Sequence, residues 1–199
     1  MEARDCGHTT HIPFFCKNCS LFKTHSTAAL SYFDVFPPRT FDVDKDALKR
    51  RYLDLQKTLH PDKLPCRQKK MGTLFSSWVG EGYRTLLDPG RRAAYLIGAE
   101  TKKHGEVSPE YMEKIFEWSS QAENAPPEKN KETVSEIGRE MQRKEKELSL
   151  LFKRAFPPIE EVRKRIHEYR YCAEVKERVQ KSVSKESFLE RERGVSEVR

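Results

Sequence analysis

Long hydrophobic runs are missing from this chain of 199 residues. No stretch approaches the roughly 20 consecutive apolar residues that a membrane-spanning helix needs, so we expect a soluble protein. Runs of β-branched residues are also scarce, whereas Lys, Glu and Arg dominate the second half of the chain. This composition favours helices over strands and predicts an all-α protein with one ordinary domain or two small ones.

A disulfide framework and a clear targeting segment are lacking as well. The chain has 5 cysteines, an odd number, and no secretory signal, which argues against paired disulfides. Its first residues include Glu2 and Asp5, whereas transit peptides are rich in Arg and poor in acidic residues. Three of the cysteines lie within the first twenty residues, which indicates a metal site instead.

Charge, in contrast, is abundant in both signs. Charged residues make up 35% of the chain, and the net charge is +7. A basic protein can bind nucleic acid, an anionic membrane or an acidic protein. Here the basic residues alternate with Glu along the expected helices, as is typical of solvated helical faces. Because no nucleic-acid-reading motif accompanies the charge, we expect neither a nucleic acid nor a membrane as partner.

Composition and periodicity divide the chain into four parts. Residues 1–28 are rich in Cys, His and Thr, and residues 31–104 show compact apolar periodicity broken by turn signals. Residues 108–181 read as long charged helices, and residues 182–199 form a polar tail without a clear apolar face. Such a tail is expected to fray or to be disordered.

A helix with one apolar and one basic side is expected to begin after Asp44, its N-cap. Its apolar residues recur at spacings of four, three and four: Leu48, Tyr52, Leu55 and Leu59. Basic residues lie mostly away from that stripe: Lys45, Lys49, Arg50, Arg51 and Lys57. The helix must end near His60, because Pro61 disfavours helical geometry in the residue before it.

A second, antiparallel helix is expected from about Gln68 to Leu87, where an Asp-Pro-Gly turn ends it. Gly80 and Gly82 lie inside this helix, and each costs on the order of 1 kcal/mol relative to Ala. We expect Gly82 to allow close packing against the antiparallel helix. For Gly80 the sequence offers no reason.

The loop between these helices reads His60-Pro61-Asp62-Lys63. In this setting the chain resembles a J domain, and more specifically the HscB family of iron–sulfur co-chaperones. The resemblance spans about residues 31–181 and is carried by SYFDVF (31–36), YLDLQKTLHPDK (52–63) and YRTLLDPGRRAAY (83–95). It implies that the chain recruits a DnaK-class (Hsp-seventy) chaperone and stimulates its ATPase through this loop.

The chemistry of the loop fits docking better than catalysis. Pro61 fixes the backbone, Asp62 accepts hydrogen bonds, and His60 can both donate and accept them. The adjacent basic side suits an acidic groove on a partner. No nucleophile or orienting group accompanies His60, so we expect a protein that is not an enzyme and has no catalytic cofactor. The residues expected to bind the chaperone are His60, Pro61, Asp62, Lys63, Lys49, Arg50, Arg51 and Lys57.

Three further helices are expected at residues 109–124, about 128–155 and about 158–181, separated by Pro-Pro pairs. Their apolar positions predict an antiparallel three-helix bundle. The HscB resemblance implies that this bundle binds the iron–sulfur scaffold protein. By alignment, the contacts implied are Tyr111, Met112, Ile115, Glu123 and Tyr171.

Two of these expectations carry alternatives. Phe116 and Ser119 stand where the family has carboxylates, so the acidic part of the interface departs from the family pattern. The apolar contacts could instead fill the core of the bundle. Tyr171 is the best candidate for exposure, because it lies off the core stripe that contains Tyr169 and Cys172.

A cysteine knuckle precedes the helices. Cys16 and Cys19 form a CxxC pair, and Cys6 with His8 or His11 would complete four ligands, with His25 a weaker choice. Two thiolates at this spacing suit tetrahedral zinc. Animal-type HscB proteins carry two CxxC pairs here, whereas this chain keeps one. Free thiols, a redox CxxC and an iron–sulfur site are the alternatives to a structural zinc.

Two functions therefore compete. The first is a J-protein of iron–sulfur cluster biogenesis that delivers the cluster scaffold to a DnaK-class chaperone. The second is a general protein-folding J-protein, although the Gly/Phe-rich linkers and β-rich client domains usual in that class are absent here. The resemblance implies a mitochondrion or a mitochondrion-derived organelle as the location, and a cytosolic pool stays open.

Overall fold

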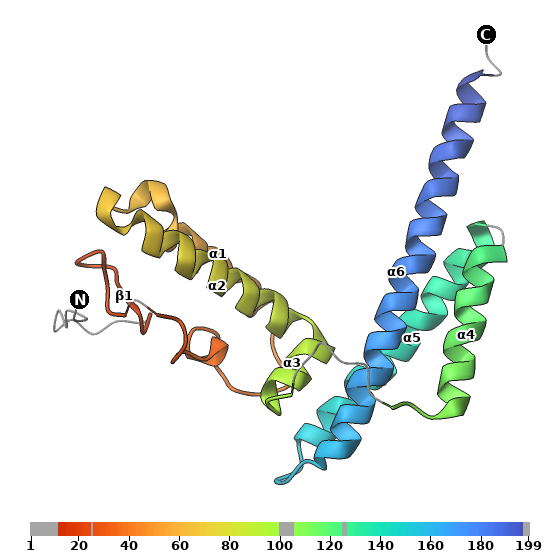
Figure 1. Ribbon diagram of the computed structural model, residues 1–199, viewed down its shortest axis with the longest axis horizontal. Helices are drawn as coiled ribbons and strands as arrows, with labels where there is room; N and C mark the ends of the chain where they lie inside the picture. Colours follow the sequence, from red (N-terminus) through yellow and green to blue (C-terminus); the bar gives the residue numbers. More distant parts are fainter. Residues whose placement is uncertain (1–11, 25, 100–105, 125–126, 197–199) are drawn as a thin grey trace. The chain divides into compact units, whose positions relative to one another are not determined.

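The computed structural model describes two compact units, residues 1–96 and 97–199, which are treated separately below (Figure 1). The backbone is described for residues 12–24, 26–99, 106–124 and 127–196, and side chains are described there except for 122–124, 127 and 183–196. Most of this chain is helical, which confirms the all-α prediction. None of the described helices is long and apolar enough to span a membrane.

The first unit opens with a short hairpin that the sequence did not predict. Strands β1 (Phe15–Cys16) and β2 (Leu21–Phe22) pair antiparallel, with Phe15 opposite Phe22. Phe14 stacks on Phe75 with ring centroids 4.3 Å apart, and Phe22 stacks on Phe75 at 5.1 Å. The described part of the Cys-rich segment is therefore packed into the same hydrophobic core as the helices that follow.

Two antiparallel helices, α1 (Lys45–Leu59) and α2 (Lys69–Leu87), form most of the first unit (Figure 1). Asp44 caps α1 as predicted, because its carboxylate accepts hydrogen bonds from the backbone N–H groups of Asp46 and Ala47. The predicted apolar stripe of α1 faces α2, and Leu55 and Leu59 are fully buried. Between the helices, Gln56 exchanges two hydrogen bonds with the Oγ and the backbone carbonyl of Ser76.

Gly80 and Gly82 of α2 differ in their surroundings. A Cβ at Gly82 would lie 2.7 Å from Cδ1 of Tyr32, which belongs to the short 3-10 turn η1 (Tyr32–Asp34). Gly82 thus allows close packing against this first turn, and the prediction that it packs against the antiparallel helix is wrong. A Cβ at Gly80 would meet side-chain atoms only at 3.8 Å and beyond, so that position has room.

A buried arginine joins α2 to α3 (Pro89–Leu96). Arg92 donates hydrogen bonds to the carbonyl groups of Leu86 and Leu87, which have no partner inside a helix that ends here. Its guanidinium also lies 4.7 Å from the ring centroid of Phe41. Arg92 of α3 therefore caps the end of α2 directly before the Asp-Pro turn that the sequence indicated.

The second unit is the predicted antiparallel three-helix bundle. Its helices are α4 (Pro109–Asn124), α5 (Pro127–Phe152) and α6 (Ile159–Ser196). The apolar core contains Trp118 of α4, Ile137 of α5, and Val175 and Val179 of α6. The backbone of α6 continues as a helix to Ser196, beyond the predicted end of this helix near residue 181. Its Lys, Glu and Arg residues are good helix formers, and no proline interrupts them.

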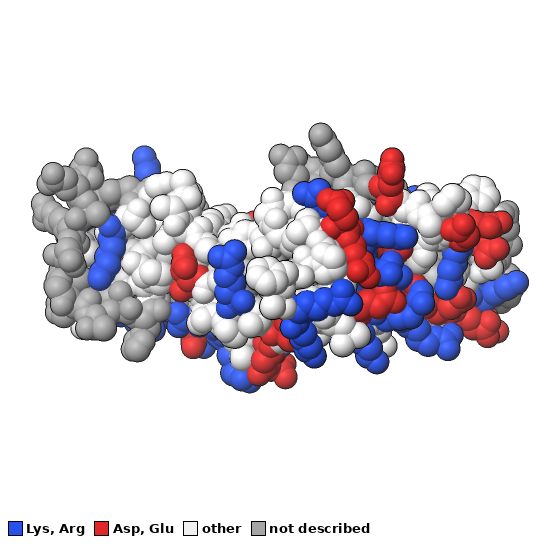
Figure 2. All heavy atoms as spheres, turned by 90° about the horizontal axis from the view of Figure 1, so that it is seen from below, with Lys and Arg blue, Asp and Glu red and all other residues white. Residues whose placement is uncertain are grey.

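Basic and acidic side chains alternate over the bundle. On the face shown in Figure 2, they are interleaved on the right-hand side, which is the second unit. Pairs such as Arg163–Glu160 and Lys181–Glu177 lie three or four residues apart on α6, at N–O distances of 3.0 and 2.6 Å. This interleaving agrees with the solvated helical faces expected from the sequence.

Candidate functional site

The His-Pro-Asp loop lies at the end of the α1–α2 hairpin. His60 leaves the helical conformation as the C-cap of α1, and Pro61–Lys63 form the 3-10 turn η2. The backbone N–H of Asp62 donates to Nδ1 of His60 at 3.3 Å, which leaves Nε2 as the imidazole nitrogen that can donate to a partner. The side chains of His60 and Asp62 are 58% and 83% exposed. The loop thus presents one donor and one carboxylate at a fixed spacing.

Buried apolar residues hold this loop on both sides. Leu59 precedes it and Leu64 follows it, and both lie in the core of the first unit. Gly72 of α2 faces them: a Cβ there would overlap Cδ1 of Leu64 and lie 3.0 Å from the carbonyl oxygen of Leu59. The absence of a side chain at position 72 therefore lets the loop sit against α2. Leu64 and Gly72 were not predicted from the sequence, although Gly72 lies near the start of the helix that follows the loop.

The basic face of α1 is smaller than the sequence suggested. Lys49, Arg50 and Lys57 are exposed, and together we call them the basic face. Arg51 is half-buried, and its Nε donates to the backbone carbonyl of Val35 at 3.0 Å. Its guanidinium thus ties α1 to the segment after η1, and its role in binding the chaperone stays a prediction. Leu53, which is 45% exposed, lies between Lys49 and Lys57 at helical spacing and was not predicted.

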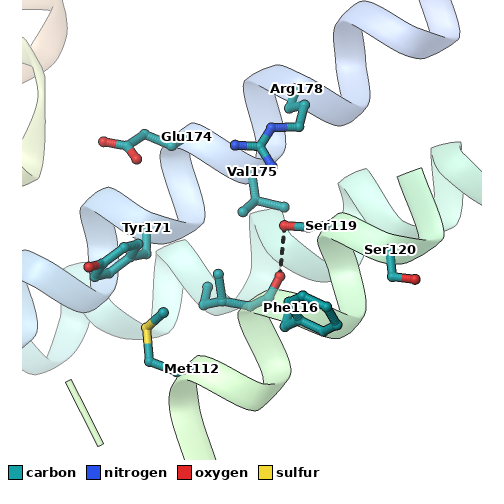
Figure 3. A pocket seen from close by; sticks show the side chains of 9 residues that line it. Met112, Phe116, Ser119, Ser120, Tyr171, Glu174, Val175 and Arg178 are labelled. Atoms are coloured by element: carbon teal, nitrogen blue, oxygen red, sulfur yellow. Dashed lines mark hydrogen bonds between the residues drawn. The ribbon is translucent and has the colours of Figure 1, made fainter. Parts of the chain in front are cut away.

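A groove runs between α4 and α6 in the second unit (Figure 3). It has a volume of about 340 Å³. We call it the α4–α6 groove; its lining residues are Met112, Ile115, Phe116, Ser119, Ser120, Tyr171, Glu174, Val175 and Arg178. Buried Ile115 and Val175 belong to the core beneath it, whereas Met112 and Phe116 are 37% and 75% exposed. The groove thus combines an apolar interior with exposed apolar side chains at its edge.

The structure brings together three of the five residues predicted to bind a scaffold. Met112, Ile115 and Tyr171 line the groove. Exposure was expected for Met112 and is found there, but Ile115 is buried because it also packs in the bundle core. Tyr171 is partly exposed at the groove, as predicted. The side chain of Glu123 lies outside the described residues.

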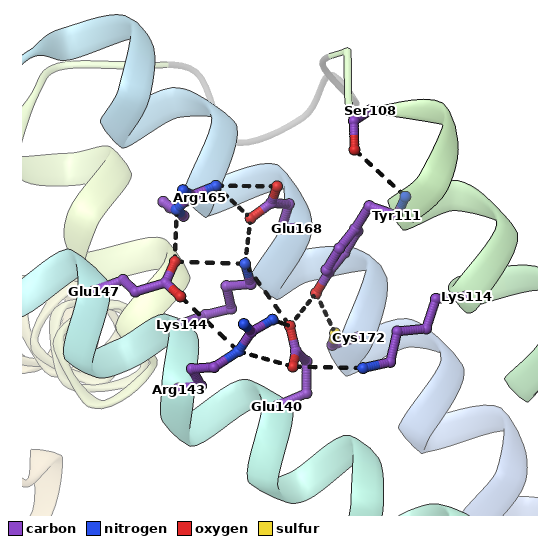
Figure 4. A network of polar contacts seen from close by, with 10 residues as sticks. All are labelled: Ser108, Tyr111, Lys114, Glu140, Arg143, Lys144, Glu147, Arg165, Glu168 and Cys172. Carbon is purple, nitrogen blue, oxygen red and sulfur yellow. Dashed lines mark hydrogen bonds and ion pairs between the residues drawn. The ribbon is translucent and has the colours of Figure 1, made fainter.

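Tyr111, the remaining predicted contact, points into the bundle instead (Figure 4). Its hydroxyl donates to Oε1 of Glu140 at 3.2 Å and lies 3.0 Å from Sγ of Cys172. Burial raises the pKa of the Tyr111 hydroxyl, and it raises the pKa of the Cys172 thiol to about 11. The prediction of an exposed Tyr111 is wrong, since this side chain fastens α4 to both α5 and α6.

Charged side chains surround this contact inside the bundle (Figure 4). Lys144 of α5 and Glu168 of α6 are both buried and pair at 2.7 Å. Burial would raise the pKa of Glu140, but the hydrogen bond from Arg143 and nearby positive charges outweigh it and keep that pKa low. Such a network leaves a charge unpaired if the helices slip, so it favours a single alignment of the three helices.

The cysteine knuckle is only partly within the described chain. Cys16 is buried in the hairpin and Cys19 is partly exposed in its turn. Cys6, His8, His11 and His25 lie outside the described residues. Within the part of the chain that the structure describes, no cluster of three metal-binding side chains occurs. Two soft thiolates on a tight turn fit half of a zinc site.

Comparisons with known proteins point in one direction. Residues 107–180 match the family model of the HSCB C-terminal oligomerisation domain. A co-chaperone protein HscB homolog of Paraburkholderia xenovorans is 31% identical over 127 residues, which cover 58% of this chain and 71% of the relative. A homolog of Neisseria meningitidis is 29% identical over 134 residues, covering 63% of this chain and 81% of the relative.

Two solved structures share the fold. The crystal structure of human co-chaperone protein HscB superposes with a TM-score of 0.75 and 24% identity, covering 90% of this chain and 97% of that protein. The chaperone HscB from Vibrio cholerae gives a TM-score of 0.67 and 23% identity, covering 78% and 99%. These likenesses extend across both units of the chain.

Proposed function

The chain belongs to the HscB family of co-chaperones, and from this we propose that it stimulates the ATPase of a DnaK-class chaperone and delivers the iron–sulfur cluster scaffold protein to it. The observation that carries the proposal is the exposed His60–Asp62 pair on a loop held rigidly beside the basic face. ATP is bound and hydrolysed by the partner chaperone, so this chain needs no nucleotide site of its own.

The first step is docking of the α1–α2 hairpin. Lys49, Arg50 and Lys57 would steer an acidic surface of the chaperone toward the loop, as complementary charges do in transient complexes. Asp62 then accepts hydrogen bonds from the chaperone and disturbs the contacts that hold hydrolysis back. Because Leu59 and Leu64 fix the loop, little conformational entropy is lost when it docks.

The second step is presentation of the client. The α4–α6 groove is the surface that we assign to the scaffold protein, since it offers exposed apolar side chains in a defined depression. Carrying the client and the chaperone on one chain raises their effective concentration for each other. This coupling distinguishes the role from that of a general folding co-chaperone with varied unfolded clients.

Two further expectations belong to the same proposal. We assign a structural zinc to Cys16, Cys19, Cys6 and either His8 or His11, which would close the turn of the N-terminal hairpin. Native mass spectrometry should show one zinc that is lost when Cys16 and Cys19 are both replaced. We also assign the protein to mitochondria or mitochondrion-derived organelles, the location of its eukaryotic relatives, which imaging of the tagged protein tests.

The main test is single-turnover ATP hydrolysis by the cognate DnaK-class chaperone, with the scaffold protein present or omitted. We expect this protein to stimulate hydrolysis, the scaffold to increase that stimulation, and Asp62→Asn to abolish it without loss of helical content. Asp54→Asn is the matched control, because Asp54 is an exposed carboxylate of α1 outside the loop. Stimulation that ignores the scaffold would instead favour the general folding role, and stimulation that survives Asp62→Asn would refute the loop assignment.

A further inference from the structure

The edge of the α4–α6 groove carries an unusual pair of side chains. On α4 the groove is bordered by Met112, Phe116, Ser119 and Ser120, none of which is charged. Phe116 is 75% exposed although a phenyl ring is costly to leave in water. Figure 3 shows Phe116 on α4 and Arg178 on α6, on the two sides of the depression.

Arg178 lies outside the ion pairs that form along α6. The preceding residue, Glu177, pairs with Lys181 one turn further along α6 at 2.6 Å. Arg178 makes no hydrogen bond or ion pair with any residue that the structure describes, and its side chain is exposed at the groove. Its planar guanidinium is therefore available for two parallel hydrogen bonds to a carboxylate.

We propose that Phe116 and Arg178 determine which client segment the α4–α6 groove accepts: a protein segment that places an apolar side chain against Phe116 and a carboxylate against Arg178. The inference rests on the proposed function, in which the occupant is the iron–sulfur scaffold protein. An exposed aromatic ring supplies apolar contact area, and an arginine supplies the carboxylate preference. A client segment that places a basic residue against Arg178 is rejected, because the two like charges repel each other.

A second copy of this chain fits the groove less well. In a symmetric dimer the same surface faces itself, so Arg178 would need a carboxylate from the groove of the partner copy. Glu174 is the acidic residue that lines this groove, and it already has a contact within its own chain. The unpaired guanidinium is therefore better satisfied by an acidic residue from a different protein.

The experiment measures binding of the purified scaffold protein to the full chain by isothermal titration calorimetry. We expect Phe116→Ser and Arg178→Glu each to weaken binding by about tenfold or more. Phe156→Ser is the matched control for the ring, because Phe156 is 92% exposed at the α5–α6 turn, away from the groove. Arg139→Glu on α5 is the control for the charge. Both controls should bind within about twofold of the wild-type chain.

A charge exchange identifies the partner carboxylate. Exposed acidic residues of the scaffold protein are changed to Lys one at a time, and we expect one such change to restore binding to Arg178→Glu while weakening binding to the wild-type chain. Circular dichroism confirms that each variant is folded. Sedimentation velocity of the chain alone, without scaffold, measures whether the chain associates with itself.

The outcomes separate the two levels of the proposal. If the wild-type chain binds scaffold and both groove variants bind equally well, the assignment of Phe116 and Arg178 is overturned while the proposed function stands. If the wild-type chain binds no scaffold, the proposed function fails and this inference fails with it. If Phe116→Ser abolishes self-association of the chain, a second copy occupies the groove and the inference is overturned.

Discussion

Replacing Gly72 by Ala is expected to weaken both the first unit and its action on the chaperone. In an open helix position this change would stabilise the helix by about 1 kcal/mol. Here the new Cβ overlaps the side chain of Leu64 and lies 3.0 Å from the carbonyl oxygen of Leu59, which is backbone and cannot turn away. Overpacking of this kind costs about 1–3 kcal/mol, so the net effect is a destabilisation of up to about 2 kcal/mol.

Gly80→Ala is the matched control, because the same substitution is made two turns further along α2. The nearest atoms to its new Cβ are Nη1 of Arg84 at 3.8 Å and Nε2 of Gln56 at 4.0 Å, which are ordinary contacts. No strain offsets the helix preference there, and we expect a stabilisation of about 0.5–1 kcal/mol. The free energy of unfolding should therefore fall in Gly72→Ala and rise in Gly80→Ala, and the two variants should differ by roughly 1–3 kcal/mol.

Hydrogen exchange measured by mass spectrometry reports this difference in α1 and α2 alone, with α5 and α6 as an internal reference. We expect protection in α1 and α2 to fall in Gly72→Ala and to rise in Gly80→Ala. Single-turnover hydrolysis should need several-fold more of the Gly72→Ala protein for half-maximal stimulation, because Leu64 no longer holds the loop. Equal protection and equal stimulation in the two variants would refute the assignment of Gly72 as the support of the loop.

Three further predictions follow from buried groups. Gly82→Ala should destabilise the first unit by about 1–2 kcal/mol in urea unfolding, since its Cβ would lie 2.7 Å from Tyr32. Phe14→Ala should cost about 3–5 kcal/mol by the same measurement, and unchanged stability would contradict the integration of the hairpin into the core. Stability of the second unit should fall by about 1–3 kcal/mol as pH rises from 9 to 11, because the unfolded Cys172 thiol ionises near pH 9 while the folded thiol stays protonated up to its pKa of about 11. Urea titrations at several pH values check this sign, and a rise in stability with pH would refute it.

The helices could be predicted because local signals agree with the final packing. Asp44 before an apolar stripe gave the start of α1, and Pro61 gave its end. The three bundle helices followed from proline-marked links and apolar spacing. For the groove, alignment identified Met112 and Tyr171, but periodicity could not show that Tyr111 turns inward, since neighbouring residues on a helix share a face only in part.

Other features depend on contacts between distant parts of the chain. Lys144 and Glu168 read as solvated charges on two different helices, and only the packed bundle shows them buried together. The hairpin strands are two residues long, so no alternation could reveal them. Burial of Phe14 and Phe22 against Phe75 follows from tertiary packing, which overrides the polar composition of the segment around them.

The His-Pro-Asp loop and the α4–α6 groove rest on different kinds of support. The His-Pro-Asp loop depends on apolar packing by Leu59 and Leu64 and on the open space at Gly72. The α4–α6 groove depends on Tyr111, whose hydrogen bonds to Glu140 and Cys172 fix the position of α4. No residue is shared between these two supports, because they lie in separate units. Substitutions at the groove edge such as Phe116 are therefore expected to leave the geometry of the His-Pro-Asp loop unchanged.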